Sequence, residues 1–325
     1  MSMKRRDSRL RFVVLAGVLS LTVATCGGGT DDTTTTADAG ADTTQAATDT
    51  TEAATDTTEE MADTTSGEAT GDLTEMFPDG SVTVGIANEI PYGYEDEEGN
   101  ATGEAPEVAK AILDELGITE VDAVVVDFGA LIPGLQAGQF DMIAAGMFIT
   151  PERAEEIIFS DPDYCGATAF AVPEGNPDGL TDFQSVVDAG INLAVLSGAV
   201  EEGYALDSGV PDANLTRFGE AADAFDALAA GRVDAVALTD VTVATQVAAL
   251  DGFESTEGFI PVIDGEEQLG CGGFGFVDQE FRDIFNAKLN KFQDEGKILP
   301  IVSEFGFSET AVEKAKTLTV EDLAE

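Results

Sequence analysis

One arginine in this sequence stands where a helix disfavours positive charge, which suggests that it binds an anion. In the stretch "AAGMFITPERAEEI", Thr150 is typical of a helix N-cap and Pro151 of a first helical residue. Arg153 then falls in the first turn, where the helix dipole disfavours a cation. A guanidinium can hold a carboxylate through two parallel hydrogen bonds, and the amides of a helix N-terminus favour the same anion. The alternative is a surface ion pair of Arg153 with Glu152 or Glu156.

Aromatic and acidic residues are predicted to lie on the same rim as this arginine. Glu89 and Tyr92 follow the first predicted strand, Phe128 ends the second, and Phe148 and Arg153 follow the third. In open α/β sheets, ligands bind beyond the carboxyl ends of the strands. Aromatic faces stabilise a bound cation by about 0.5–2 kcal/mol, and Glu89 would supply a countercharge. Taken singly, however, Phe128 and Phe148 are typical core residues, and Glu89 could be a solvated loop acid.

The elements that must position these residues alternate between strands and helices from residue 82 onward. In the first run, strands are predicted at 82–87, 121–128 and 140–146, with helices at 104–116, 129–138 and from Thr150. An extended link at 164–175 leads to a second run. Its strands are predicted at 192–198, 214–219 and 233–240, and its helices at 199–209, 221–231 and 241–250. A strand at 271–277 and two or three helices end the chain. This order implies parallel strands with right-handed crossovers.

The composition excludes several classes of function. The chain has 325 residues, no histidine and a net charge of −48, and after Cys26 it has 10 Lys and Arg against 62 Asp and Glu. Such charge argues against nucleic acid or an anionic membrane surface as a partner. The scattered acids lack the EF-hand spacing, and three cysteines without histidine make a zinc site improbable, so we expect no metal and no cofactor. A solvated surface adapted to high salt explains the acids.

The N-terminus has the pattern of an export signal. Residues 1–25 combine a basic start with an apolar stretch, and Cys26 follows. The sequence "VATC" resembles the lipobox of bacterial lipoproteins, although Thr25 departs from the usual Gly or Ala; the alternative is ordinary cleavage beside an incidental cysteine. Residues 26–73 are rich in Thr, Asp, Ala, Glu and Gly, without aromatic residues or periodicity, which predicts a lipid-anchored, disordered acidic tether.

Several motifs occur in the order found in a known family. The segments "GLQAGQFDMIAAGMFITPERAEEIIFSDPDY" and "AAGRVDAVALTD" resemble family 3 of the extracellular solute-binding proteins of ABC importers. The segments "IANEIPYGY", "FGALIPGLQAG", "GMFITPER" and "EFGF" resemble its ectoine/hydroxyectoine-binding members. The resemblance implies an α/β type II periplasmic-binding-protein fold, with two lobes, a mostly parallel sheet in each, and two hinge crossovers. Lobe 1 would comprise 74–165 and 271–325, and lobe 2 would comprise 166–270.

The resemblance also implies roles in the first lobe. The arginine of this family motif, Arg153 in this sequence, clamps the carboxylate of the bound solute. Tyr92, Phe128 and Phe148 would surround a solute such as ectoine, a ring zwitterion with a delocalised cation.

The second lobe contributes further candidate ligand-binding residues. Gly198, Val200 and Glu201 lie in "SGAVEE", where backbone amides could meet the carboxylate, although many family members have Thr in place of Val200. Amino-acid-binding members place an Asp where this chain has Thr239, and Asp240 follows one residue later. This departure weakens the interpretation as an ordinary amino-acid receptor.

Cysteine arithmetic predicts one disulfide. If Cys26 is lipidated, Cys165 and Cys271 remain, and they lie on the two segments that enter and leave the second lobe. We therefore expect them to be bonded neighbours at the hinge.

We interpret the chain as a binding protein and not as an enzyme. It would capture ectoine or hydroxyectoine, a small zwitterionic solute, and deliver it to ABC permease subunits. It would act as a monomer on the outer face of the cytoplasmic membrane or in the periplasm. The alternatives are a receptor for a polar or modified amino acid, a cyclohexadienyl-dehydratase-like enzyme with Glu89 and Glu201 as acids, and an adhesin or structural lipoprotein.

Overall fold

The computed structural model describes residues 71–324. The predicted signal sequence, Cys26 and nearly all of the predicted tether lie outside these residues. Leu73, at the end of the predicted tether, is fully buried, and its N–H donates to the carbonyl of Leu116 at 3.1 Å. A single apolar residue at the end of a polar stretch carries no periodicity, so the sequence did not reveal this contact. No helix within residues 71–324 is long and apolar enough to cross a membrane.

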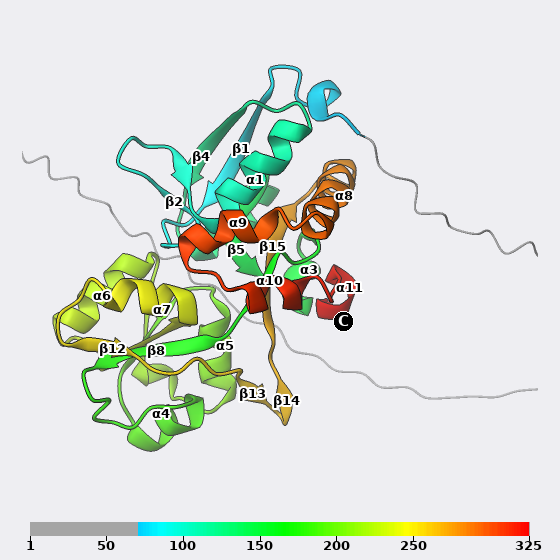
Figure 1. Ribbon diagram of the computed structural model, residues 1–325. Coiled ribbons are helices and arrows are strands. Elements are labelled where there is room, and N and C mark those ends of the chain that lie inside the picture. The colour runs from blue at the N-terminus through cyan, green and yellow to red at the C-terminus, as the bar shows by residue number, and fades with distance from the viewer. Residues whose placement is uncertain (1–70, 325) are drawn as a thin grey trace, which may run out of the picture. The chain divides into compact units, whose positions relative to one another are not determined.

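The first sheet contains strands from both ends of the described chain (Figure 1). Its order is β4-β1-β5-β15-β6, with β7 paired to β15. Strands β4, β1 and β5 are parallel, as the alternating pattern predicts, whereas β15 is antiparallel to β5, β6 and β7. The strands are β1 (Ser81–Ile86), β4 (Glu120–Val125), β5 (Met142–Phe148), β6 (Ile158–Phe159), β7 (Tyr164–Gly166) and β15 (Gly270–Phe276).

The second sheet repeats this arrangement. Its order is β10-β9-β11-β8-β12, with β10, β9 and β11 parallel and β8 antiparallel to β11 and β12. In both sheets the first strand of the run therefore lies between the second and the third. The strands are β8 (Thr168–Pro173), β9 (Leu193–Leu196), β10 (Leu215–Phe218), β11 (Ala235–Thr239) and β12 (Phe253–Ser255). Two small pairs are β2 (Tyr94–Glu95) with β3 (Ala101–Thr102), and β13 (Val262–Ile263) with β14 (Glu266–Glu267).

The helices follow the predicted order, with additions. The connecting helices are α1 (Glu104–Glu115), α2 (Leu131–Gln136), α3 (Pro151–Ala154), α5 (Val200–Asp207), α6 (Ala221–Ala229) and α7 (Asp240–Val247). The prediction missed α4 (Phe183–Ala189), whose capping box of Asp182 and Ser185 was the available signal. Four α-helices follow β15 where two or three were predicted: α8 (Gln279–Asp294), α9 (Ile298–Val302), α10 (Glu309–Ala315) and α11 (Val320–Leu323). The 3₁₀ turns are η1 (Leu73–Glu75), η2 (Phe128–Ala130), η3 (Asp212–Asn214) and η4 (Ser303–Phe305).

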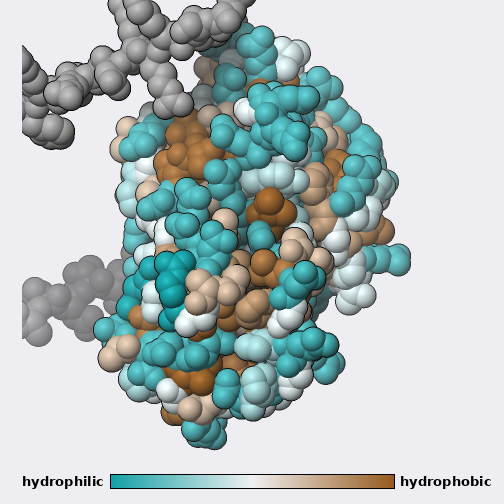
Figure 2. All heavy atoms as spheres, turned by 90° about the vertical axis from the view of Figure 1, so that its left-hand side faces the viewer, coloured by the Kyte–Doolittle hydropathy of each residue, from teal (hydrophilic) through white to brown (hydrophobic). Residues whose placement is uncertain are grey.

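Amphipathic spacing explains how a helix such as α1 packs. Its residues Val108, Ala109, Ile112 and Leu113 are all fully buried and recur at the spacing of one helical face. On the face drawn in Figure 2, by contrast, hydrophilic residues predominate, and hydrophobic residues form small separate groups. The acid-rich composition thus coexists with an apolar core.

The chain crosses between the two sheets twice, once between β7 and β8 and once between β12 and β15. Cys165 and Cys271 are directly paired residues of β7 and β15, and the predicted disulfide joins them. These two lobes with two crossovers form the type II periplasmic-binding-protein fold. We propose that the lobe boundaries lie at the crossovers, near residues 165 and 271.

Candidate functional site

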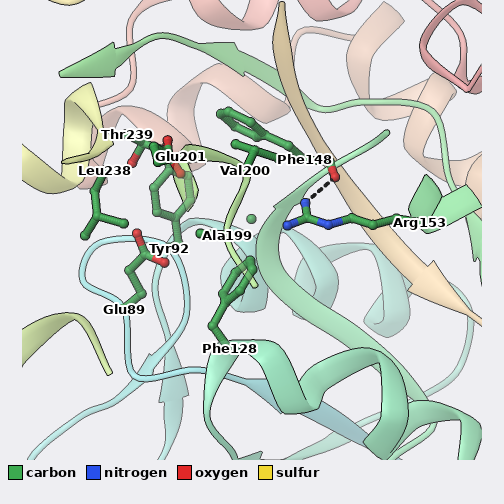
Figure 3. A pocket seen from close by; sticks show the side chains of 11 residues that line it. Glu89, Tyr92, Phe128, Phe148, Arg153, Ala199, Val200, Glu201, Leu238 and Thr239 are labelled. Carbon is green, nitrogen blue, oxygen red and sulfur yellow. Dashed lines mark hydrogen bonds between the residues drawn. The ribbon is translucent and has the colours of Figure 1, made fainter. Parts of the chain in front are cut away.

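A cavity lies between the two lobes, beyond the ends of the parallel strands (Figure 3). The cavity has a volume of about 20 Å³. Eight of the ten predicted ligand-binding residues line it. The full lining is Glu89, Tyr92, Phe128, Gly146, Phe148, Arg153, Ala199, Val200, Glu201, Leu238 and Thr239.

Two glycines on neighbouring strands make room for the aromatic rings of the cavity. A Cβ atom at Gly146 on β5 would overlap the ring of Tyr92, and a Cβ atom at Gly270 on β15 would overlap the ring of Phe148. Because strands β5 and β15 are paired, both openings lie in one part of the first sheet. Sequence patterns could not predict these contacts, since each glycine is distant in sequence from the aromatic residue that it contacts.

Arg153 lies where the sequence predicted, at the start of the one-turn helix α3. The Thr150 hydroxyl accepts a hydrogen bond from the Arg153 N–H at 3.3 Å, and Pro151 is the first helical residue. The guanidinium donates from Nη1 to the carbonyl of Phe148 at 2.6 Å and from Nη2 to the carbonyl of Gly198 in lobe 2 at 2.9 Å. Its carbon Cζ lies 5.5 Å from the centre of the Phe128 ring.

The alternative of a surface ion pair is not what the structure contains. Within residues 71–324, Arg153 forms no salt bridge with Glu152, Glu156 or any other acid. Burial lowers the pKa of the guanidinium, and the nearby Glu201 carboxylate acts in the opposite direction. Arg153 is half-buried, so its charge is only partly solvated, which favours an anionic partner.

Two buried carboxyl groups line the same cavity, one from each lobe. Glu89 is 5% exposed, and its Oε1 accepts a hydrogen bond from the Thr242 hydroxyl at 2.8 Å. Glu201 is 2% exposed, and its Oε1 accepts one from the Thr168 hydroxyl at 3.3 Å. Burial raises the pKa of each carboxyl group to about 7; for Glu201, the Arg153 cation opposes this effect. Glu89 is thus not a solvated loop acid.

The three predicted aromatic residues are all buried at the cavity. Tyr92 packs against two further rings, with centroid distances of 5.3 Å to Tyr164 and 5.2 Å to Phe307. The prediction missed both of these supporting rings. The segment "SDPDY" ends with Tyr164, and "EFGF" ends with Phe307, but no spacing rule connects the two segments with Tyr92.

Two predicted residues of lobe 2 lie beside the cavity and do not line it. Asp240 begins α7, and its Oδ1 accepts a hydrogen bond from the Val241 N–H at 2.9 Å. Gly198 meets Arg153 through its carbonyl, while its N–H donates to Glu202 Oε2 at 2.9 Å. The N–H of Ala199 donates within its own turn, to the carbonyl of Leu196 at 3.1 Å. Two of the backbone amides expected to meet a carboxylate are therefore already used.

The arrangement separates charges of opposite sign. Figure 3 shows Arg153 and Phe128 on one side of the cavity, and Glu89, Tyr92, Glu201 and Thr239 on the other. Among the described residues, no group of three His, Cys, Asp or Glu side chains is placed to hold a metal ion. A small solute that carries separated positive and negative charges matches this pattern.

Comparison with known proteins identifies the family of the chain. The sequence profile of the bacterial extracellular solute-binding proteins, family 3, matches residues 82–308. A probable amino-acid ABC transporter periplasmic-binding protein of Sinorhizobium fredii is 36% identical over 256 residues, which cover 77% of this chain and 85% of that protein. An L-arginine-binding protein of Pseudomonas aeruginosa is 28% identical, with 72% and 90% covered.

Solved structures with the same fold bind two kinds of solute. The crystal structure of EhuB in complex with hydroxyectoine is similar with a TM-score of 0.71 and 32% identity, covering 78% of this chain and 97% of that chain. An ancestral amino acid-binding protein, a precursor of cyclohexadienyl dehydratase, is similar with a TM-score of 0.62 and 28% identity, covering 72% and 98%.

Proposed function

Because the chain belongs to family 3 of the bacterial extracellular solute-binding proteins, we propose that it captures ectoine or hydroxyectoine for an ABC importer. Members of this family deliver small amino-acid-like solutes to the permease of an ABC transporter. The proposal concerns which solute occupies the cavity. Arg153 would hold the carboxylate, the aromatic rings would pack against the delocalised cation, and Glu89 and Glu201 would balance its charge.

The separation of Arg153 from two buried carboxyl groups is the observation that carries the proposal. An ordinary amino acid presents its ammonium group one carbon from its carboxylate, and amino-acid-binding members of the family meet it with an Asp at the position of Thr239. In this chain Thr239 is neutral, and Asp240 is not among the residues that line the cavity. The likeness to EhuB, whose complex contains hydroxyectoine, supports the same solute class.

Solute entry requires movement of the protein. A cavity volume of about 20 Å³ accommodates about one water molecule, and it does not accommodate a ring of several atoms. The hydrogen bonds of Arg153 to Gly198 and of Thr242 to Glu89 join the lobes across the cavity. We propose that the lobes separate about the two crossovers and close again on the solute, a hinge motion common among binding proteins.

A thermal-shift panel of ectoine, hydroxyectoine, betaines and the common amino acids tests the proposal. A solute at 100 times its dissociation constant stabilises the folded protein by about 2.7 kcal/mol, which raises the melting temperature measurably. We expect the two ectoines to give the largest shifts. If an ordinary amino acid alone shifts the melting temperature, the chain is an amino-acid receptor.

A second candidate function is an exported dehydratase. Glu89 and Glu201 are buried carboxyl groups with a pKa of about 7, as suits general acid catalysis near neutral pH. A dehydratase acting on a dicarboxylate would need a second cation, and Arg153 is the one cation among the residues that line the cavity. Incubation with prephenate or arogenate, followed by product absorbance, distinguishes the two functions.

A further inference from the structure

We propose that the hydroxyl groups of Tyr92 and Thr239 form a polar subsite for a neutral hydroxyl group on the solute, so that the chain prefers hydroxyectoine to ectoine. This inference rests on the proposed function and names a preference within it. Both side chains line the cavity, and they are 1% and 8% exposed. Neither Tyr92 Oη nor Thr239 Oγ1 has a hydrogen-bond partner among the described residues.

The Thr239 hydroxyl is available because it does not perform the usual task of its position. Thr239 is the N-cap of α7, where a threonine side chain ordinarily accepts a hydrogen bond from the first turn of the helix. Here it makes no such bond, and the neighbouring Asp240 accepts from the Val241 N–H at 2.9 Å. The hydroxyl therefore remains at the cavity wall (Figure 3).

The Tyr92 hydroxyl is held on a fixed ring. Gly146 leaves space for the ring, and Tyr164 and Phe307 pack against it at 5.3 and 5.2 Å. The Tyr164 hydroxyl donates to the carbonyl of Gly146 at 2.6 Å, so it is satisfied where that of Tyr92 is not. Burial raises the pKa of Tyr92, and the Thr239 hydroxyl opposes this effect. Figure 3 shows Tyr92 and Thr239 on the same side of the cavity.

Hydroxyl groups that are buried without partners penalise a solute that leaves them unpaired. An unsatisfied buried polar group is costly, and a site built to bind a substrate hydroxyl discriminates strongly against the analogue that lacks it. Each hydroxyl can donate and accept one hydrogen bond, which suits a neutral alcohol. The cationic group of the solute has its own partners in Glu89 and Glu201.

Isothermal titration of hydroxyectoine and ectoine into wild-type protein, Tyr92→Phe, Thr239→Val and the double variant tests the subsite. We expect wild-type protein to bind hydroxyectoine about tenfold or more tightly than ectoine. Each single variant should reduce this ratio by about threefold or more, and the double variant should bring it near one, because hydroxyectoine affinity falls more than ectoine affinity. Tyr94→Phe and Thr245→Val, which remove hydroxyl groups outside the cavity, should keep the wild-type ratio. Thermal melts establish that each variant is folded.

Four outcomes would overturn the inference. Equal wild-type affinities for the two solutes, or a ratio unchanged in both single variants, would reject the subsite and leave the proposed function standing. Equal losses of affinity for both solutes in the variants would mean that the hydroxyl groups support the packing of the cavity and do not bind the solute hydroxyl. If neither solute binds wild-type protein while an amino acid does, the proposed function and the inference both fail.

Discussion

At the scale of single residues, the cavity combines one guanidinium with two carboxyl groups that water barely reaches. Each group has protein partners, but none of those partners neutralises its charge completely. Arg153 donates to two carbonyl groups, and Glu89 and Glu201 each accept from one threonine hydroxyl. A solute that presents a carboxylate and a cation at suitable separation would supply the missing charges.

Replacing Arg153 with lysine should weaken solute binding about tenfold or more. Lysine keeps the charge but cannot hold a carboxylate with a planar fork, and one charge-assisted hydrogen bond contributes about 1.5–3 kcal/mol. Isothermal titration of the best solute into Arg153→Lys measures the loss. The exposed Arg232 provides the matched control, since Arg232→Lys should leave affinity unchanged. Wild-type affinity in Arg153→Lys would remove this residue from the site.

Solute affinity should rise as the pH increases from about 6 to about 8. Glu89 and Glu201 have pKa values raised to about 7 by burial, so each is largely protonated below that pH and ionised above it. The ionised forms balance a cationic solute, and binding should therefore release protons near pH 7. Titrations in buffers of different ionisation enthalpy measure this release. In Glu89→Gln the affinity should be lower and the pH dependence weaker; an unchanged profile would show that Glu89 does not face the cation.

At the scale of elements, the start of α1 meets the segment just before β7 through two buried acids. Glu104 is fully buried at the first position of α1, and both of its carboxyl oxygens lack hydrogen-bond partners within the described residues. Asp163 is 2% exposed and precedes β7. Burial raises the pKa of Asp163 to about 6 and that of Glu104 well above its ordinary value, to which the charge of Asp163 also contributes.

This pair should make the folded protein less stable as the pH rises. Both carboxyl groups bind protons more tightly in the folded state, so their stabilising contribution is complete below pH of about 4 and is lost as the pH passes the folded pKa values, from about 6 upward. Glu104→Gln removes one charge and should flatten this loss, giving a higher melting temperature than wild type at pH 8. Each kcal/mol of unfolding free energy corresponds to a change of about 2–4 °C in the melting temperature of a domain of this size.

Melting curves between pH 4 and pH 8 test the pair against a control. Glu98→Gln, on an exposed loop, should follow the wild-type profile. Parallel profiles for wild type and Glu104→Gln would contradict the raised pKa of Glu104.

At the scale of the whole molecule, two lobes with their own sheets are joined by two crossovers, and a disulfide ties the crossovers together. The bond between Cys165 and Cys271 spans 106 residues, essentially the whole second lobe. It constrains the unfolded chain and keeps β7 and β15 paired beside the hinge. We therefore expect the proposed opening of the cavity to pivot near this tied pair of strands.

The predicted lipid anchor gives a test at the same scale. Replacing Cys26 with serine should move the protein from the membrane fraction to the soluble fraction, because the lipid would have no attachment site. Solute affinity should not change, since the cavity lies in the folded residues and the anchor precedes them by about 45 positions. Fractionation with immunoblotting and titration of the purified variant measure the two properties separately. A Cys26→Ser protein that remains with membranes would contradict lipidation at this residue.

The sequence by itself determined the features that depend on neighbours along the chain. Hydrophobic periodicity identified the alternating strands and helices, and the signals of Thr150 and Pro151 located the turn that carries Arg153. The number of cysteines and their places beside the second lobe identified the disulfide.

Tertiary structure alone decided the contacts between segments that are distant in sequence. It kept Asp240 out of the cavity lining and left the hydroxyl of Thr239 there, it brought Gly146 under the ring of Tyr92, and it buried Glu104 beside Asp163. Periodicity and capping act over one or two turns, so they predict which element a residue belongs to. Packing of the two lobes fixes which side chains meet, because steric fit and hydrogen bonding across them depend on all the elements at once.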